Sequence, residues 1–169
     1  MRALLTPLAF VIAALPFAVH AEGKLKVDES VEINAPADAV WSKISNFGDL
    51  GAWHPAVKTT EIVTGKNNEK GAVRLLTLQD NGTIKEALEA YNPKRHSYSY
   101  RIIEGVLPVT DYRSTITVKA LNATSSKVTW SGKFNGKDST KKASDDAVTT
   151  ITSVYKDGLN NLKKIIETK

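Results

Sequence analysis

The segment from Gly71 to Ala90 constrains the fold of this 169-residue chain more than any other part of it. It contains two runs of alternating apolar and polar residues, joined by the turn signal Asp80-Asn81-Gly82. A three-residue loop with Gly82 in the left-handed conformation would set Gln79 opposite Thr83. The segment is therefore predicted to be an antiparallel β-hairpin.

One face of this hairpin is apolar and yet carries an acid and a base. In the three-residue register Arg74 lies near Leu88, and Glu86 lies near Leu76 on the same face. A buried charge is costly unless it is paired or solvated, so the two charges indicate a lined cavity rather than a dry core. A two-residue Asn81-Gly82 loop is the alternative, and it would separate Arg74 from Glu86.

The first residues, MRALLTPLAFVIAALPFAVHA, have the pattern of a secretory signal peptide. Arg2 gives a short positive region, an apolar run follows, and Val19-His20-Ala21 precedes an expected cut before Glu22. A membrane anchor is the alternative, but two prolines interrupt this short run. We expect residues 1–21 to be a signal peptide and residues 22–169 to form one periplasmic domain that has no membrane span.

Composition narrows the chemistry. The chain has no cysteine, which excludes disulfides, thiolate metal sites and a cysteine nucleophile. His54 and His96 are far apart and give no metal signature, so we expect no metal and no cofactor. The formal charge of +5 is mild, and the basic residues form no block, so no nucleic-acid partner is expected. The sequence also contains no phosphate-binding glycine loop and no nucleophile elbow.

The order of the remaining elements predicts the fold class. A helix is expected to begin at Asn34 or Ala35, with Pro36 in its first turn, and to end at Gly48. A second short helix follows at 49–52, and a long amphipathic helix at about 144–168 contains Gly158, which marks either a close approach or a plain loss of stability. Strands are predicted at 25–33, 57–64, in both arms of the hairpin, and around 98–102, 112–118 and 128–134. This order predicts an α+β fold in which a curved antiparallel sheet wraps around the last helix.

A sheet of this kind leaves a space between itself and the helix. The inward side chains would be mostly apolar with a few polar groups, which is the usual composition of a small-molecule site. The alternation places the following residues on that face: Glu29, Arg74, Glu86, Tyr98, Tyr100, Tyr112, Ser114 and Trp130.

Several segments resemble the START-like superfamily that includes Bet v 1, in its polyketide cyclase/dehydrase branch. The resemblance covers essentially the whole mature chain and is carried by an ordered series of segments: INAPADAVWSKISNFGDLGAWHPAV, GAVRLLTL, IKEALEAYN, YSYRIIEGVLPVTDYRSTITV and VTWSGKF. It implies a helix-grip fold, in which a seven-stranded antiparallel sheet surrounds a C-terminal helix and encloses a hydrophobic cavity.

Two groups within the superfamily imply different functions. The chain resembles the periplasmic accessory proteins of bacterial methanol oxidation, which implies a periplasmic dehydrogenase or cytochrome as partner. More distantly it is similar to plant lachrymatory factor synthases, whose cavity Arg, Glu and Tyr resemble Arg74, Glu86 and Tyr112. That second resemblance implies a cofactor-free enzyme. Fold alone does not choose between them.

We expect a small hydrophobic ligand, with Glu86 and Arg74 as the candidate catalytic pair. A largely apolar cavity would raise the pKa of Glu86 unless Arg74 holds it ionised. The pair could orient a ligand, act in catalysis as base or acid, or serve only as an internal ion pair. His54 is better explained by loop packing, and the tyrosines by core packing, although their hydroxyl groups need partners. The candidate ligand-binding residues are Arg74, Glu86, Tyr98, Tyr100, Tyr112, Trp130 and Trp53.

Overall fold

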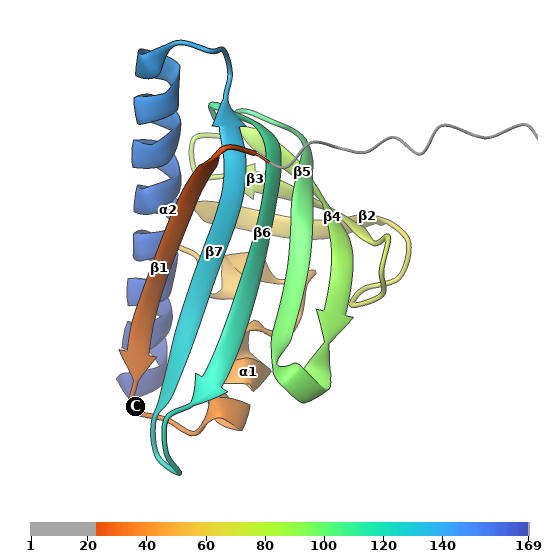
Figure 1. The fold of residues 1–169 in the computed structure, drawn as a ribbon. Helices are drawn as coiled ribbons and strands as arrows, with labels where there is room; N and C mark the ends of the chain where they lie inside the picture. Colours follow the sequence, from red (N-terminus) through yellow and green to blue (C-terminus); the bar gives the residue numbers. More distant parts are fainter. Residues whose placement is uncertain (1–22, 169) are drawn as a thin grey trace, which may run out of the picture.

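Seven antiparallel strands form a single sheet in the order β1-β7-β6-β5-β4-β3-β2 (Figure 1). The computed structural model describes residues 23–168, so the predicted signal peptide lies outside the described residues. The helices are α1 (Ala37–Ile44) and α2 (Lys141–Glu167), with short 3-10 turns η1 (Leu50–Ala52) and η2 (Pro93–Arg95). The strands are β1 (Leu25–Ile33), β2 (Val57–Thr64), β3 (Val73–Leu78), β4 (Thr83–Asn92), β5 (Ser97–Gly105), β6 (Val109–Ala120) and β7 (Ser126–Gly136).

The sheet is strongly curved around one long helix. Figure 1 shows β2 and β3 crossing the direction of β1 and β7, while α1 lies at the lower end of the molecule. Helix α2 packs against β1 and β7, with fewer contacts to the latter. This is the α+β helix-grip arrangement that the sequence predicted, with its curved antiparallel sheet, its two short helices after the first strand and its long C-terminal helix.

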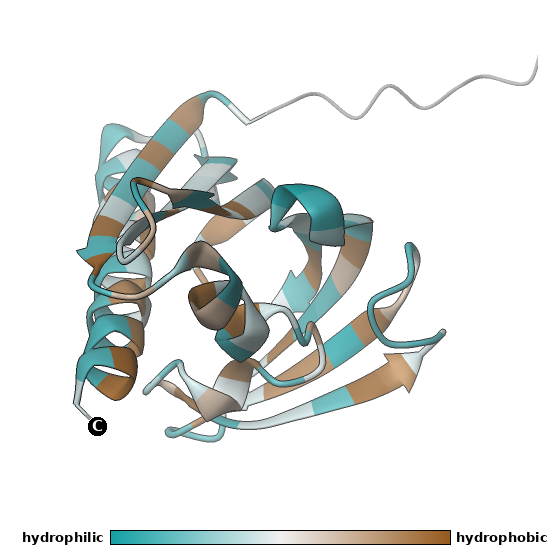
Figure 2. Ribbon diagram, turned by 90° about the horizontal axis from the view of Figure 1, so that it is seen from below, coloured by the Kyte–Doolittle hydropathy of each residue, from teal (hydrophilic) through white to brown (hydrophobic). Residues whose placement is uncertain are grey.

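The core lies between the sheet and α2. Residues along the strands alternate between buried and exposed, and Figure 2 shows the corresponding bands of hydropathy along the ribbon. Trp130 and Phe134 of β7 are buried, as are Ile151, Tyr155 and Leu159 of α2. The rings of Trp130 and Tyr155 stack at 4.4 Å between centroids. Each large side chain buried in this way contributes about 1.5–3 kcal/mol.

Helix α1 is shorter than predicted. It begins after Pro36, which occupies the cap position rather than the first turn, and it ends at Ile44 rather than Gly48. The reason lies just beyond the end of α1, where side chains of the β2–β3 loop accept hydrogen bonds from the backbone amides. The Phe47 amide donates to Asn68 Oδ1 and the Gly48 amide donates to Asn67 Oδ1, each at 2.9 Å. Side-chain acceptors of this kind compete with helical hydrogen bonds and stop the helix.

Helix α2 begins earlier than predicted, at Lys141 rather than Ser144. Thr140 caps it, because its hydroxyl oxygen accepts a hydrogen bond from the Ala143 amide at 3.1 Å. Two further ion pairs follow in its first turns, Lys141 with Asp145 and Lys142 with Asp146, at the spacing that suits a helix.

The β3–β4 hairpin confirms the predicted parity but not the predicted loop. Arg74 lies directly opposite Glu86, and Thr77 lies opposite Thr83, so the pairing is shifted by two residues from the three-residue register. Asn81, with φ of 66°, takes the left-handed conformation that was expected of Gly82. Asp80 explains this turn, since its Oδ1 accepts the Gly82 amide at 2.9 Å.

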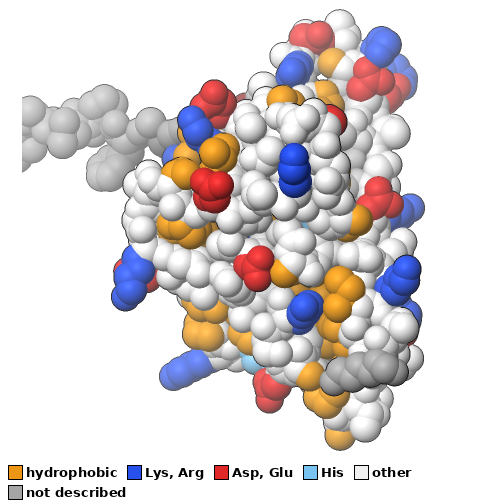
Figure 3. All heavy atoms as spheres, turned by 180° about the vertical axis from the view of Figure 1, so that it is seen from behind, with side chains coloured by type: hydrophobic (Ala, Val, Ile, Leu, Met, Phe, Trp, Pro, Cys, Tyr) orange, Lys and Arg blue, Asp and Glu red, His pale blue; other side chains and the backbone are white. Residues whose placement is uncertain are grey.

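The surface carries both signs of charge. On the face seen from behind, basic and acidic side chains are interspersed with small hydrophobic groups (Figure 3). Over residues 23–168, none of the helices combines the length and apolar character needed to cross a membrane.

Candidate functional site

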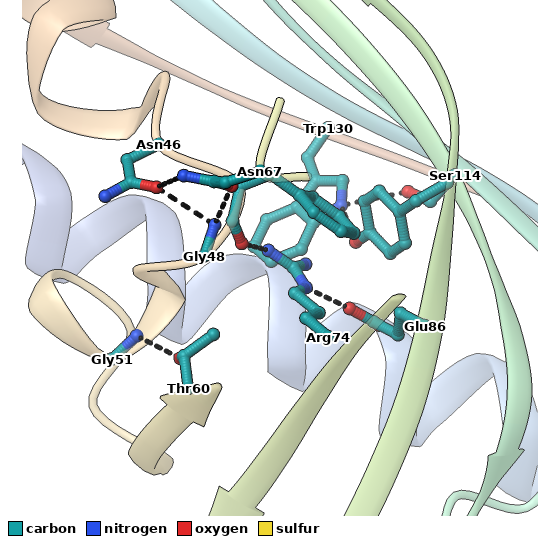
Figure 4. A network of polar contacts seen from close by, with 11 residues as sticks. Asn46, Gly48, Gly51, Thr60, Asn67, Arg74, Glu86, Ser114 and Trp130 are labelled. Atoms are coloured by element: carbon teal, nitrogen blue, oxygen red, sulfur yellow. Dashed lines mark hydrogen bonds and ion pairs between the residues drawn. The ribbon is translucent and has the colours of Figure 1, made fainter. Parts of the chain in front are cut away.

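A buried ion pair lies at the centre of the concave face. Arg74 of β3 donates from Nε to Glu86 Oε2 of β4 at 2.6 Å (Figure 4). The Arg74 side chain is fully buried, whereas the Glu86 side chain keeps 6% of its surface accessible. The two side chains, which the sequence placed on one face of the hairpin, are therefore in direct contact, and Glu86 is the partner that lines the cavity.

The guanidinium group of Arg74 is held from several sides. Its Nη1 donates to the backbone carbonyl of Phe47 at 2.7 Å, which links the sheet to the segment between α1 and η1. Its Cζ lies 4.1 Å from the Phe47 ring centroid and 5.0 Å from that of Tyr100, so both rings offer their faces to the cation. Its Nη2 is buried without a hydrogen-bond partner among the described residues. The cation is thus fixed in place by rings and a carbonyl as well as by Glu86.

Burial dominates the electrostatics of this pair. It raises the pKa of Glu86 above the ordinary carboxyl range, and the neighbouring charge of Arg74 opposes that rise. Burial is the largest single influence on Arg74 and acts to lower its pKa, but the charge and hydrogen bond of Glu86 together with Tyr98 and Tyr100 outweigh it, and the net shift is upward. The pKa of Tyr98, beside the pair, rises to about 12 because its hydroxyl is buried. Glu86 therefore keeps its proton up to a higher pH than an exposed carboxyl group does.

The space next to Glu86 is a small cavity of about 70 Å³. Its wall is apolar apart from a few groups and comes from every layer of the fold: Leu50, His54, Ala56, Val57, Leu76, Leu78, Ile84, Glu86, Tyr100, Leu107, Tyr112, Trp130 and Val154. Sites for small molecules usually measure roughly 300–1,000 Å³. The large space predicted from the sequence is therefore wrong for this structure, because the aromatic side chains of the sheet and of α2 fill most of it.

A second polar network lies beside the cavity. Ser114 Oγ donates to the Ser131 carbonyl at 2.8 Å, so it must accept from both Tyr155 OH at 2.9 Å and Trp130 Nε1 at 2.9 Å. Tyr155 OH then accepts from Tyr112 OH, at 2.6 Å. The Ser131 carbonyl can only accept a hydrogen bond, and it therefore fixes which group donates at every other step of the network.

This direction leaves one hydroxyl proton uncommitted. Tyr100 OH accepts a hydrogen bond from Trp130 Nε1 at 3.0 Å, and its own proton has no acceptor assigned among the described residues. Tyr100 and Glu86 both line the cavity. The cavity therefore offers a ligand one carboxyl group and one hydroxyl donor in an otherwise apolar wall.

His54 lines the cavity but is fully engaged by the backbone. Its Nε2 lies 3.0 Å from the Val154 carbonyl, and its Nδ1 accepts from the Ala56 amide at 3.2 Å. These partners define a neutral ring with the proton on Nε2. Burial lowers the pKa of His54, which also favours the neutral form. The packing role expected of this residue agrees with this geometry.

Two glycines make room for these side chains. A β-carbon on Gly132 of β7 would lie 2.2 Å from Tyr155 OH, and one on Gly158 of α2 would lie 2.6 Å from His54 Cδ2. The glycine in the middle of α2 therefore marks a close approach to a buried loop, which was one of the two explanations left open by the sequence.

The predicted site residues divide into two groups. Glu86, Tyr100, Tyr112 and Trp130 line the cavity. Arg74, Tyr98 and Trp53 are buried behind it, where Trp53 packs on Trp130 at 5.5 Å and its Nε1 has no partner among the described residues. Glu29, which was expected on the inward face, is not part of the cavity wall; its carboxylate lies 3.8 Å from Lys156 Nζ of α2.

Sequence reasoning missed two features of the site. Tyr155 is not among the predicted site residues, although Gly132, which lies opposite it in β7, was an available signal. Asn67 and Asn68 of the β2–β3 loop are not among the predicted site residues either, yet they hold the segment that carries the Phe47 carbonyl. No sequence pattern indicated the contacts that Asn67 and Asn68 make with this segment.

The fold defines a helix-grip protein with a small apolar cavity between its sheet and its long helix. The family model described as "Polyketide cyclase / dehydrase and lipid transport" matches residues 24–167. The chain therefore belongs to this family, whose members bind small hydrophobic molecules.

Similar proteins come from plants and bacteria. The abscisic acid receptor PYL6 of Arabidopsis thaliana is 30% identical over 90 residues, which cover 52% of this chain and 42% of the receptor. This chain thus spans less than half of that relative. MLP-like protein 423 of the same plant is 30% identical over 112 residues, covering 62% of this chain and 72% of that protein. The solved structure of XoxI from Bacillus cereus is 33% identical, with a TM-score of 0.76, and covers 83% of this chain and 94% of XoxI.

Proposed function

We propose that this protein binds a small hydrophobic ligand in the cavity beside Glu86, and that binding rather than catalysis is its function. One observation carries the proposal: Glu86 and Tyr100 line an apolar cavity, while the other polar side chains of its wall, His54, Tyr112 and Trp130, already have hydrogen-bond partners. Arg74 holds the carboxyl group of Glu86 in place through the ion pair. Arg74 itself is fully buried and is not part of the cavity wall. An apolar wall with two available polar groups selects and orients a ligand.

The test is a titration with the uncharged fluorescent probe N-phenyl-1-naphthylamine. Wild-type protein should show saturable binding to one site. Leu78→Trp places a large ring at a residue of the cavity wall and should weaken binding at least tenfold. Val63→Trp adds the same ring at an exposed residue outside the cavity and serves as the matched control. Equal binding by the two folded variants would place the probe elsewhere and reject the proposal.

We further propose that the protein is exported and assists a periplasmic dehydrogenase or its cytochrome in methanol oxidation. Support comes from the leader-like segment 1–21 and from the resemblance to the accessory proteins of that pathway. N-terminal sequencing of the periplasmic fraction should give a chain that starts at Glu22. Full-length protein retained in the cytoplasm would contradict export, and native mass spectrometry of the periplasmic protein would identify what accompanies it.

A cofactor-free cyclase, dehydrase or isomerase is the second candidate. The observation that favours it is the pairing of Glu86, whose pKa is raised by burial, with the Tyr100 hydroxyl on the same cavity wall. Such a pair could remove a proton beside a carbonyl group and stabilise the resulting enolate. Deuterium exchange at the α-carbon of 2-tetralone in heavy water tests this. Exchange that disappears in Glu86→Gln supports an enzyme, and a rate equal to buffer alone rejects it.

A further inference from the structure

The sheet is split between β5 and β6. Their pairing ends with Arg101 opposite Arg113, although both strands continue. Beyond that point β5 stays paired with β4 as far as Gly105, and β6 stays paired with β7 at Val109. The two strands therefore diverge while each remains attached to its other neighbour.

A local bulge in β6 accompanies this split. The register with β7 shifts between Thr110 and Arg113, and Asp111 within the shift has φ of 50°, in the left-handed region. Asn135 of β7 holds Asp111 there, since its Nδ2 donates to Asp111 Oδ2 at 3.0 Å. Bulges of this kind end pairing and redirect side chains, so the split belongs to the fold.

The split opens into a slot of about 270 Å³. Its walls include the apolar side chains of Ile102, Leu107 and Val109. Leu107 and Tyr112 line both this slot and the internal cavity, so the two spaces adjoin at these side chains. The cavity alone holds only part of an ordinary ligand, and the slot is an adjoining space of about 270 Å³ whose wall combines these apolar side chains with charged residues.

The lining of the slot carries two arginines, Arg101 and Arg113, and two acidic residues, Glu104 and Asp111, which are engaged by Lys85 and Asn135. Arg101 and Arg113 lie side by side on the outer face of the sheet, and both contact the same carboxylate, Glu89, at 3.6 and 3.1 Å. Lys133 lies opposite Arg113, and Lys26 lies opposite Lys133, so four basic residues cross four neighbouring strands in one row. Lys26 pairs with Asp28, and the two guanidinium groups share the single carboxylate of Glu89, so one positive charge of the arginine pair is left for an anion.

We propose that the ligand is an amphiphile with an anionic head, which lies with its apolar body in the slot, reaching toward the cavity, and its head beside Arg101 and Arg113. The inference rests on the proposed ligand-binding function and adds the chemical class of the ligand and its orientation. The carboxylate, sulfonate or phosphate of such a molecule remains at the outer face, where the two guanidinium groups can bind it. The apolar chain passes Leu107 and Tyr112, which line the slot and the cavity alike.

The test compares dodecanoate with dodecanol as competitors of N-phenyl-1-naphthylamine, because they share a chain and differ in the charge of the head. In wild type, dodecanoate should compete more strongly, and added salt should reduce the difference. Each lost guanidinium should lower the preference for dodecanoate by about fivefold, so the Arg101→Gln/Arg113→Gln double variant should lose most of it. Lys119→Gln removes one charge from the far end of β6 and should keep the preference.

A second pair of variants tests the route. Val109→Trp fills the slot and should slow association of the probe at least tenfold, whereas Val106→Trp, an exposed residue outside the slot lining, should not. Ile103→Trp covers the rim and replaces Val109→Trp if that variant does not fold, because Ile103 is 47% exposed. Equal association rates in the slot-filling and control variants would overturn the route.

The outcomes separate the two proposals. If the probe binds but dodecanoate and dodecanol compete equally in wild type, the anionic head is rejected while the ligand-binding function stands. If the preference survives in the double arginine variant, the assigned position of the head is wrong. If wild type binds neither the probe nor either competitor, the proposed function fails and this inference fails with it.

Discussion

A β-carbon placed on Gly158 would lie 2.6 Å from Cδ2 of His54 and 2.9 Å from the six-membered ring of Trp130. Real side chains essentially never approach so closely. Gly158 weakens the middle of α2, but it also allows the loop after η1 to reach the core. There His54 hydrogen-bonds to the Val154 carbonyl of α2.

Gly158→Ala should destabilise the protein although alanine is the better helix former. Helix propensity favours alanine by about 1 kcal/mol, but overpacking against two rigid rings costs about 1–3 kcal/mol. We expect a net loss of up to about 2 kcal/mol in the free energy of unfolding, measured with urea. Asn160→Ala, at an exposed residue of the same helix, is the control and should be neutral or stabilising. A Gly158→Ala protein more stable than wild type would contradict the steric explanation.

The buried ion pair predicts a strong coupling between two substitutions. Arg74→Met or Glu86→Leu alone should cost about 3–5 kcal/mol, because each leaves its partner buried and unpaired. The double variant should recover much of that loss, since neither charge remains. A double-mutant cycle by urea unfolding measures this coupling. Additive losses would show that the two charges are not energetically linked.

His54 should make stability depend on pH on the acidic side of neutrality. Burial lowers its pKa in the folded state, while the unfolded chain binds the proton at about pH 6.5. Stability is therefore complete above about pH 6.5 and is lost as the pH falls toward the folded-state pKa, by up to about 1.4 kcal/mol per pH unit. Comparing wild type with His54→Gln between about pH 5 and 7 isolates this contribution, because other groups cancel. Parallel stability curves would contradict a buried neutral ring.

The polar network predicts an order among single substitutions. Ser114→Ala removes the group that bonds to Ser131, Tyr155 and Trp130, so it should cost about 1–3 kcal/mol. Tyr100→Phe leaves Trp130 Nε1 its bond to Ser114 and should cost about 1 kcal/mol or less. Thermal or urea unfolding of both variants checks the order. A larger loss in Tyr100→Phe would mean that the uncommitted hydroxyl proton has an internal acceptor.

Parity along the strands was enough to predict the fold and the ion pair. A shift of two residues in the pairing of β3 with β4 leaves Arg74 and Glu86 on the same face of the sheet. The pair could therefore be predicted although the hairpin loop was assigned incorrectly. Asn81 rather than Gly82 adopts the left-handed conformation because the Asp80 side chain captures the Gly82 amide. That choice depends on a side-chain hydrogen bond, which alternation does not report.

The size of the cavity could not be predicted from the same pattern. Trp130 and Tyr155 come from β7 and α2, and their rings stack in the space that alternation left open. How far two inward side chains interpenetrate depends on their rotamers and on the gap that Gly132 creates. Binary patterning shows which residues face inward, but it contains no information on how much volume remains between them.

The position of β1 has a consequence for the order in which the chain can fold. β1 is an edge strand whose neighbour is β7, and Leu25 meets Phe134 from the far end of the sequence. Closing so long a loop is entropically expensive and slow, whereas the β3–β4 and β6–β7 hairpins join neighbouring segments. When the chain is made from its N-terminus onward, β1 therefore has no partner strand until β7 and α2 have been synthesised. Until then one edge of the sheet is unpaired and the core is not covered by the helix.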